Sequence, residues 1–279
     1  GKTTGAPLIE HDDVRMISFT GGTKGGIAAS LSASKKVKPI IMELGGKSPQ
    51  IIFKDADLNL AVNGVISGIF PVTGQSCISD SRILVHKDIK EEFTNKLLEV
   101  VRKAKVGHPN DSSTQIGPIA NKEQYEFILS KIDDAEKRGL KLLIDGRSEK
   151  RSEGYYIGPT IFDNVPNEDD LAQNEVFGPV ASLQSWDNEN EVINIANDSI
   201  YGLAAGIWSK DVNKAIRTAD KIEAGTVYIN NYFNASTQSP VGGFKQSGYG
   251  RENGWEGMQC YMQTKSTWLA TEPSQPDPF

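Results

Sequence analysis

The sequence predicts an α/β fold in which a largely parallel sheet carries helices on its faces. Short segments rich in β-branched residues alternate along the chain with longer segments in which apolar residues recur at helical spacing. The composition, 38% hydrophobic and 24% charged over 279 residues, is that of an ordinary globular protein. A chain of this length can form one large domain or two modest ones.

The first elements form a βαβ unit. Residues 14–19 are strand-like, a glycine-rich turn follows, and the small residues of 27–34 predict a helix before a second strand over 39–42. The same alternation then continues. The next expected elements are a strand over 51–53, a helix over 58–69 and a strand over 83–86.

Two amphipathic helices are expected in the middle of the chain. Over residues 87–104, apolar side chains recur at helical spacing and the opposite face is charged. Residues 121–138 show the same pattern, and Gly139 ends this helix as a C-terminal glycine does.

The second half alternates in the same way, apart from a polar linker over 145–154. Residues 272–279 have the composition of a disordered or partner-dependent tail. The expected strands are 142–144, 159–162, 180–186, 203–208 and 226–229, and the expected helices are 188–197 and 211–222.

Charge and cysteine content narrow the functional classes. A formal charge of -6 argues against nucleic acid or an acidic membrane surface as the main partner. No stretch reaches the roughly 18 apolar residues of a membrane span. The two cysteines are too few for a disulfide framework, which favours a reducing compartment, and we expect a cytoplasmic protein. Because the chain starts at Gly1 without an initiator methionine, we expect it to be a piece of something longer.

The strongest chemical signal is Cys77, which follows Gly74-Gln75-Ser76. Glycine at this place lets backbone amides approach the thiol and the oxyanion that it creates. We expect this setting to lower the pKa of the thiol and keep it accessible. A lone cysteine is more often structural, and Cys260 has no comparable frame.

A second signal is Glu43 in Glu43-Leu44-Gly45-Gly46-Lys47. A carboxylate with a pKa raised by partial burial can activate water as a general base, whereas an isolated glutamate is usually a surface or capping residue. The three histidines have no metal-ligand spacing with each other or with a cysteine, so we expect no metal site.

Together these motifs resemble those of the NAD(P)-dependent aldehyde dehydrogenase superfamily, whose nucleophile follows a Gly-Gln pair and whose base opens a Glu-Leu-Gly-Gly-Lys segment. The resemblance implies that Cys77 attacks an aldehyde, that a hydride passes to NAD or NADP, and that Glu43 activates the water that cleaves the resulting thioester. The product is a carboxylic acid. The glutamate argues against a relative that passes the acyl group to coenzyme A.

The resemblance also assigns cofactor-binding residues. Phe19-Thr20-Gly21-Gly22-Thr23 is similar to the family's phosphate-binding turn, with glycine where serine is usual. Glu175-Val176-Phe177-Gly178-Pro179 is similar to the segment whose glutamate binds the nicotinamide ribose and whose phenylalanine packs beside the ring. The implied cofactor-binding residues are Gly21, Gly22, Leu44, Glu175 and Phe177.

A late stretch, residues 239–248, resembles the family's segment after the aldehyde tunnel, and Tyr232, Phe233 and Val241 are the implied substrate residues. The loop over 231–238 holds no Arg or Lys, which a substrate carboxylate would need as a partner. We therefore expect an uncharged aliphatic or aromatic aldehyde rather than a semialdehyde acid.

The resemblance runs from about Leu8 to Trp268 and matches only the later part of the family's sequence. It implies an aldehyde dehydrogenase-like fold in three parts. Residues 1–45 are the remaining part of a Rossmann-type NAD(P)-binding domain, residues 46–246 are an α/β catalytic domain, and residues 247–279 return toward the cofactor domain and the oligomer interface.

The upstream asparagine of the oxyanion hole and the residues that contact the adenine ribose are missing, so the choice between NAD and NADP stays open. Loss of one oxyanion donor costs on the order of a hundredfold in rate, so an inactive piece is one alternative. Another is a non-catalytic structural or interaction fragment. A C-terminal strand that extends a sheet across an interface implies a homodimer or homotetramer.

Overall fold

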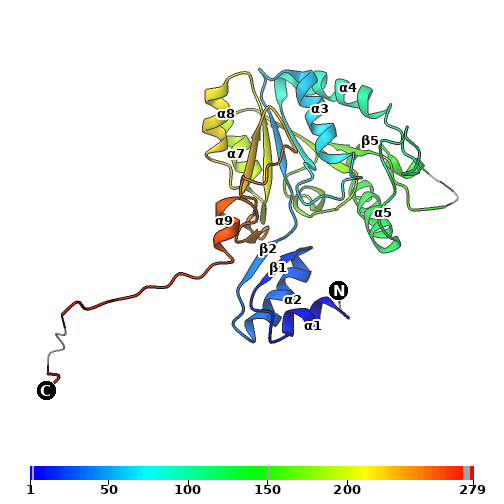
Figure 1. Ribbon diagram of the computed structural model, residues 1–279. Helices are drawn as coiled ribbons and strands as arrows, with labels where there is room; N and C mark the ends of the chain where they lie inside the picture. The colour runs from blue at the N-terminus through cyan, green and yellow to red at the C-terminus, as the bar shows by residue number, and fades with distance from the viewer. Residues whose placement is uncertain (2, 150, 152, 273–276) are drawn as a thin grey trace.

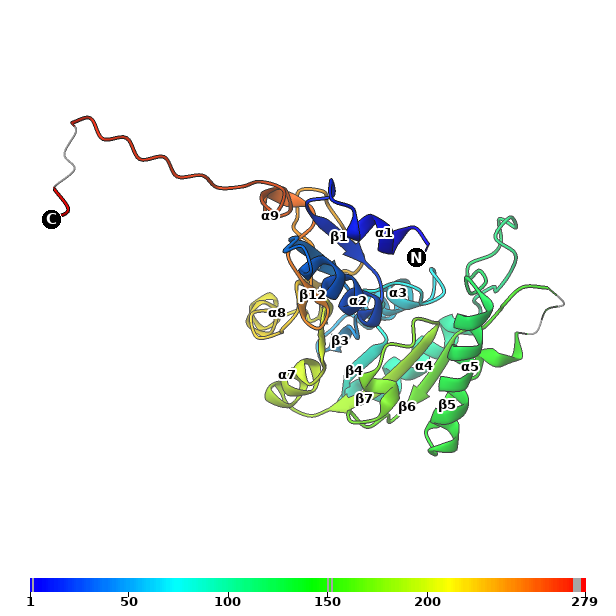
Figure 2. The same cartoon turned by 90° about the horizontal axis from the view of Figure 1, so that it is seen from below.

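The computed structural model describes residues 1, 3–149, 151, 153–272 and 277–279. A large body is built on a seven-stranded sheet, and a smaller unit formed by the first elements lies at one end of it (Figure 1). Both views show the C-terminal segment running away from the folded body after α9 (Gly254–Gln259) (Figure 2).

The small unit confirms the expected βαβ pattern. Strands β1 (Ile17–Thr20) and β2 (Ile40–Glu43) are parallel and in register from Ile17↔Ile40 to Thr20↔Glu43. Helix α2 (Thr23–Ser34) connects them and packs on α1 (Gly5–Glu10), a short helix that the sequence pattern did not predict. A third strand, β12 (Gly248–Tyr249), comes from the far end of the chain and pairs antiparallel with β2.

The large sheet has the strand order β10-β9-β3-β4-β7-β6-β5. All neighbouring strands are parallel except β5, which runs antiparallel to β6 at one edge. β3, β4 and β6 are buried on both faces, as parallel strands covered by helices are. The strands are β3 (Pro49–Ile52), β4 (Arg82–His86), β5 (Lys141–Ile144), β6 (Thr160–Asp163), β7 (Val180–Trp186), β9 (Ala204–Trp208) and β10 (Thr226–Ile229).

Helices cover both faces of this sheet (Figure 1). On one face, α3 and α4 contribute to the core that contains Val65, Phe93 and Leu97, and on the other, α7 and α8 contribute to the core that contains Val192 and Ala215. A third core lies under α5 and α6. The helices are α3 (Leu58–Ile69), α4 (Lys90–Val101), α5 (Lys122–Lys137), α6 (Asp170–Gln173), α7 (Glu189–Asn197) and α8 (Val212–Ala219).

Local capping explains where several helices begin. The carboxylate of Asp57 accepts the amides of Asn59 and Leu60 at 3.0 and 3.2 Å, so α3 starts where the sequence pattern placed it. The helix expected over 87–104 is shorter and in two parts. A 3₁₀ turn, η1 (Lys87–Ile89), precedes α4 because the His86 side chain accepts the amide of Asp88 and caps this turn separately.

The remaining elements are short. β8 (Tyr201–Gly202) pairs with β11 (Phe244–Lys245). The 3₁₀ turn η2 (Gly146–Ser148) lies in the segment that was expected to be a polar linker. Residues 150 and 152 of that segment lie outside the described residues. The expected tail over 272–279 is described only in part, because 273–276 also lie outside. Within the part of the chain that the structure describes, no helix is both long enough and apolar enough to cross a bilayer.

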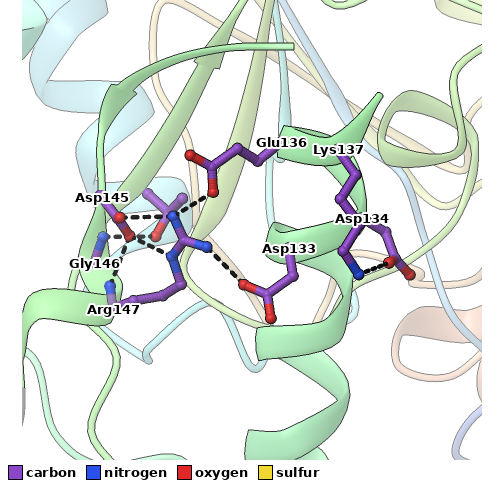
Figure 3. A network of polar contacts seen from close by, with 8 residues as sticks. Asp133, Asp134, Glu136, Lys137, Asp145, Gly146 and Arg147 are labelled. Atoms are coloured by element: carbon purple, nitrogen blue, oxygen red, sulfur yellow. Dashed lines mark hydrogen bonds and ion pairs between the residues drawn. The ribbon is translucent and has the colours of Figure 1, made fainter. Parts of the chain in front are cut away.

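Arg147 in η2 ties the edge of the sheet to α5 (Figure 3). Its guanidinium donates to Asp133 at 2.6 Å and to Glu136 at 2.8 Å on the helix, and to both carboxylate oxygens of Asp145 after β5. These carboxylates raise the pKa of Arg147, so it stays charged. The cluster fixes a helix whose first turn reaches the cavity described below.

We expect Arg147→Met to lower the free energy of unfolding by about 1.5 kcal/mol, between the values for an exposed ion pair and for a half-buried charged hydrogen bond. Urea denaturation followed by circular dichroism measures the change. Lys137→Met is the matched control, since its pair with Asp134 at 3.2 Å is exposed, and it should leave the midpoint unchanged. Equal midpoints for the two variants would contradict the stabilising role of Arg147.

Candidate active site

A cavity of about 690 Å³ lies between the small unit and the large body. It is lined by the β1–α2 turn, the segment after β2, the turn that holds Cys77, the first part of α5, and residues 175–177. Seven residues singled out from the sequence line it together. They are Gly21, Gly22, Glu43, Leu44, Cys77, Glu175 and Phe177.

The position of Glu43 is set by strand pairing on both sides of β2. Its carbonyl accepts the amide of Gly21 at 3.0 Å, and Gly248 pairs with it from β12. Just beyond it, the amide of Leu44 donates to the carbonyl of Ser247 at 2.9 Å, and the buried Ser247 hydroxyl donates to the carbonyl of Gly45 at 2.7 Å. The segment that follows Glu43 is thus fixed by Ser247, which lies about 200 residues further along the chain.

Cys77 lies on a tight turn between α3 and β4. Gly74 has φ +65, which suits glycine, and a Cβ there would lie 1.9 Å from the carbonyl oxygen of Gly178. A Cβ on Gly46 would lie 2.4 Å from the carbonyl oxygen of Cys77. The three motif segments therefore touch backbone to backbone, and side chains at these two positions would force them apart.

The pKa of Glu43 is raised to about 7, mainly by burial and also by the nearby Glu252 carboxylate, whereas Arg251 acts to lower it. Glu43 is 6% exposed, and its Oε1 has no hydrogen-bond partner among the described residues. A carboxyl group that titrates near neutrality and keeps an unpaired oxygen in a cavity can accept a proton from a water molecule.

The expectation of a lowered pKa for Cys77 is wrong for this structure. Burial raises the pKa of the thiol, and the Glu175 carboxylate adds to this effect, as does Glu43 to a smaller extent. The amides of Ile78 and of Cys77 itself act in the opposite direction but do not outweigh burial. The glycine frame does supply amides at the sulfur, but the sequence pattern does not reveal the two carboxylates beside it.

Glu175 and Phe177 enter the cavity from the segment that follows α6. The Glu175 carboxylate accepts the amide of Gly46 at 3.2 Å, and burial raises its pKa. Phe177 adopts a left-handed φ of 52 and is 38% exposed, so its ring lines the cavity rather than the core. Together they form one wall next to the thiol.

The cavity fits part of a dinucleotide. Gly22 is the N-cap of the twelve-residue α2, where no side chain caps the first amides, and a Cβ at Gly22 would meet nothing within 4 Å. Open space in front of uncapped helix amides suits a pyrophosphate. Gly21, Gly22 and Leu44 would hold this part, and Glu175 would accept from ribose hydroxyls.

The three expected substrate residues lie outside the lining of this cavity. Tyr232 is buried and donates its hydroxyl to the carbonyl of Ile78 at 2.7 Å, so it touches the Cys77 turn. Phe233 packs on Tyr232 with ring centroids 5.7 Å apart, and Val241 pairs with Glu252. Their substrate role remains a prediction.

Sequence reasoning missed the contribution of α5. Gln124 donates to the carbonyls of Val176 and Phe177 at 2.9 and 3.0 Å, and Phe127 lines the cavity beside it. Neither residue stands in a motif, and the helical pattern of α5 marks only its buried face. Among the described residues, no cluster of His, Cys, Asp or Glu side chains is arranged to hold a metal ion.

We expect Glu175→Gln to speed alkylation of Cys77 by iodoacetamide at pH 8 by about threefold or more, because loss of a nearby negative charge lowers the pKa of the thiol. Peptide mass spectrometry measures the rate, with Cys260 as internal reference. Glu168→Gln, an exposed carboxylate outside the cavity, is the matched control and should change neither rate. No acceleration in Glu175→Gln would show that burial alone raises the pKa.

Comparisons with known proteins agree with this geometry. The model of the aldehyde dehydrogenase family matches residues 1–267. A betaine aldehyde dehydrogenase of Rhizobium etli is 40% identical over 276 residues, which make up 98% of this chain and 57% of that protein. The 4-trimethylaminobutyraldehyde dehydrogenase of Homo sapiens is 38% identical over 271 residues, with 95% of this chain and 55% of that protein covered.

Solved structures give the same result. A crystal structure of betaine aldehyde dehydrogenase from Staphylococcus aureus in complex with NAD+ superposes with a TM-score of 0.94 at 40% identity, covering 99% of this chain and 55% of that one. The NAD+ complex of an aldehyde dehydrogenase from Bacillus cereus gives a TM-score of 0.92 at 37% identity, covering 96% and 54%. This chain thus spans little more than half the length of these relatives, and it belongs to the aldehyde dehydrogenase family.

Proposed function

We propose that the protein to which this chain belongs oxidises an aldehyde to a carboxylic acid with NAD(P)+, through a thioester on Cys77. The observation that carries this proposal is the meeting of Cys77, Glu43 and Glu175 in one cavity, each from a different segment of the chain. Their chemistry matches the family's reaction: a thiol to bind the carbonyl carbon, a base for water and a carboxylate for ribose hydroxyls.

In the first step, Cys77 gives up its thiol proton to solvent and the sulfur attacks the carbonyl carbon, beside the backbone amides of Cys77 and Ile78 that lie at the sulfur. Bound NAD(P)+ supplies the hydride acceptor that converts the adduct into a thioester. Glu43 then takes a proton from water as the water attacks the thioester, and the carboxylic acid leaves from the restored thiol. The phosphate-binding turn and Glu175 orient the cofactor toward the sulfur.

NAD is the cofactor we favour, because the two solved relatives described above are NAD+ complexes. We also propose the division expected from the sequence, with residues 1–45 as part of a nucleotide-binding domain, 46–246 as the catalytic domain, and 247–279 returning to the former. The pairing of β12 with β2 supports the last part of this division.

The substrate that we propose is an aldehyde without a carboxylate. Tyr228, Tyr232 and Phe233 form an aromatic cluster, with centroid distances of 4.8 and 5.7 Å between successive rings. Such a cluster suits an apolar chain, and its ring faces also suit a trimethylammonium group like the one in the name of the 4-trimethylaminobutyraldehyde dehydrogenase. The absence of Arg and Lys from residues 231–238 supports the exclusion of acids.

We further propose a cytoplasmic homodimer or homotetramer. The support for an oligomer is the exposed end of the chain, where Trp268 and Leu269 are 94% and 85% exposed. Large apolar side chains at such exposure suit burial against another subunit. A structural piece without catalysis is the competing function, and the intact Cys77 and Glu43 argue against it.

Glu43→Gln tests the mechanism in a full-length enzyme that carries this chain. We expect it to release one equivalent of NADH per Cys77 in a rapid burst and then to stop, because acylation needs no base at this position whereas hydrolysis does. Stopped-flow absorbance at 340 nm in the presence of hexanal measures the burst.

The controls separate the two steps. Cys77→Ala should give neither burst nor turnover, and the unaltered enzyme should gain turnover as pH rises through about 7, because Glu43 acts as a base only when it is ionised. A missing burst in Glu43→Gln would move this residue to an earlier step, and full turnover in Cys77→Ala would overturn the proposed function.

The substrate class is tested by comparing kcat/KM for hexanal, betaine aldehyde and succinic semialdehyde. We expect kcat/KM for hexanal or for betaine aldehyde to exceed that for succinic semialdehyde by about tenfold, or about 1.4 kcal/mol in transition-state binding. The reason is that no cation in the loop would pair with the carboxylate of the semialdehyde. A preference for the semialdehyde by the same factor would contradict the placement of the substrate loop.

A further inference from the structure

A chain of buried hydrogen bonds lies beneath the Cys77 turn. The indole nitrogen of Trp208 donates to Gln50 Oε1 at 2.6 Å, and Gln50 Nε2 donates to Asp80 Oδ2 at 2.6 Å. Gln50 and Asp80 are fully buried and Trp208 is 3% exposed. Three side chains from β9, β3 and the end of the Cys77 turn are therefore joined inside the core.

The packing around these side chains leaves no room for rearrangement. A Cβ on Gly68 of α3 would lie 2.3 Å from Asp80 Oδ2, and a Cβ on Gly206 of β9 would lie 2.1 Å from Gln50 Oε1. The Asp80 amide also faces the carbonyl of Gly68 at 3.4 Å. The carboxyl group is held by the surrounding backbone as well as by its hydrogen bond.

This hydrogen-bond chain joins the two segments that carry the proposed catalytic groups. Asp80 is three residues after Cys77, and Gln50 is the second residue of β3, the strand into which the Glu43 segment runs. On the same turn, the Tyr232 hydroxyl donates to the carbonyl of Ile78, the residue that directly follows Cys77. The turn is therefore anchored both by Asp80 and by Tyr232.

The surroundings of Asp80 favour the neutral form of its carboxyl group. Burial raises its pKa well above the usual range, and the hydrogen bond from Gln50 does not offset this effect. No cationic side chain is hydrogen-bonded to it, and Oδ1 has no partner among the described residues. A charged aspartate here would be strongly destabilising, whereas a neutral one can serve as a hydrogen-bond anchor.

We propose that Asp80 is a positioning residue that, through Gln50 and Trp208, fixes the Cys77 turn relative to the segment that bears Glu43. The inference rests on the proposed function in that Cys77 is the nucleophile to be positioned. Asp80 does not touch the reacting atoms. Its contribution is to restrict the turn to one conformation, so that the sulfur stays half-buried and directed into the cavity.

The test is the rate of Cys77 alkylation by iodoacetamide, divided by that of Cys260 in the same chain and followed by peptide mass spectrometry. In Asp80→Ala, the turn loses its anchor and solvent reaches the sulfur more often, so we expect the ratio to rise about fivefold or more. Asp80→Asn is neutral and keeps an acceptor for Gln50, so its ratio should stay within about twofold of the unaltered chain.

Thr160→Val is the matched control, because it removes another fully buried hydrogen bond, from the Gly146 amide at 3.1 Å, away from the turn. It should lower the melting temperature without changing the ratio. If circular dichroism shows that Asp80→Ala is unfolded, Trp208→Phe decides the question, and we expect it to raise the ratio by about twofold or more.

The positioning role is overturned if folded Asp80→Ala shows an unchanged or lower alkylation ratio. Where Asp80→Ala is unfolded, the same result in Trp208→Phe overturns it. An Asp80→Asn ratio equal to that of Asp80→Ala also overturns it. These outcomes leave the proposed function intact, because Cys77 still reacts. If the unaltered, folded chain shows alkylation at Cys260 and none at Cys77, both the proposed function and the positioning role fail.

Discussion

The site depends on one buried segment, residues 44–48, which carries the chain from the small sheet to the large one. Its carbonyl groups are held from two sides. The Ser247 hydroxyl donates to Gly45, and the fully buried Arg82 donates to Lys47 at 2.8 Å and to the carbonyls of Ile195 and Ala196. A buried guanidinium satisfied by three main-chain oxygens costs less than an unpaired one, and it fixes this segment against α7. Glu43 and the contact with Cys77 both depend on this anchoring.

The electrostatics of the cavity favour neutral groups at rest. Burial and two nearby carboxylates disfavour the thiolate of Cys77. The pKa of Glu43, raised to about 7 mainly by burial, keeps part of this group protonated at neutral pH. A thiol beside carboxylates gains reactivity when a positive charge enters the cavity, and an oxidised nicotinamide carries one. Under the proposed function, occupation of the cavity by the cofactor would therefore raise the reactivity of the sulfur, and a thiol without cofactor would resist oxidation.

Much of the fold could be predicted because its signals are local. α3 and β7 begin and end where periodicity and capping placed them, and the βαβ unit was found from its glycine turn. β12 was missed because its structure depends on pairing with distant residues, as Gly248 pairs with Glu43. In the site, seven of the residues chosen from motifs line one cavity, whereas the three expected substrate residues do not. The raised pKa of Cys77 and the roles of Gln124 and Phe127 could not be foreseen, because each depends on which segments become neighbours in space.

The pairing of β12 with β2 has a consequence for biosynthesis. Ser247 and Gly45 are 202 positions apart, yet the Ser247 hydroxyl holds the Gly45 carbonyl two residues after Glu43. Contacts of such sequence separation form late, because a long loop must close before they are gained. On the ribosome, the parallel sheet can assemble while α9 is still unmade, but the segment after Glu43 cannot be locked in place until Ser247 has emerged. A nascent polypeptide therefore carries the Cys77 thiol for some time before the segment that bears Glu43 is fixed beside it.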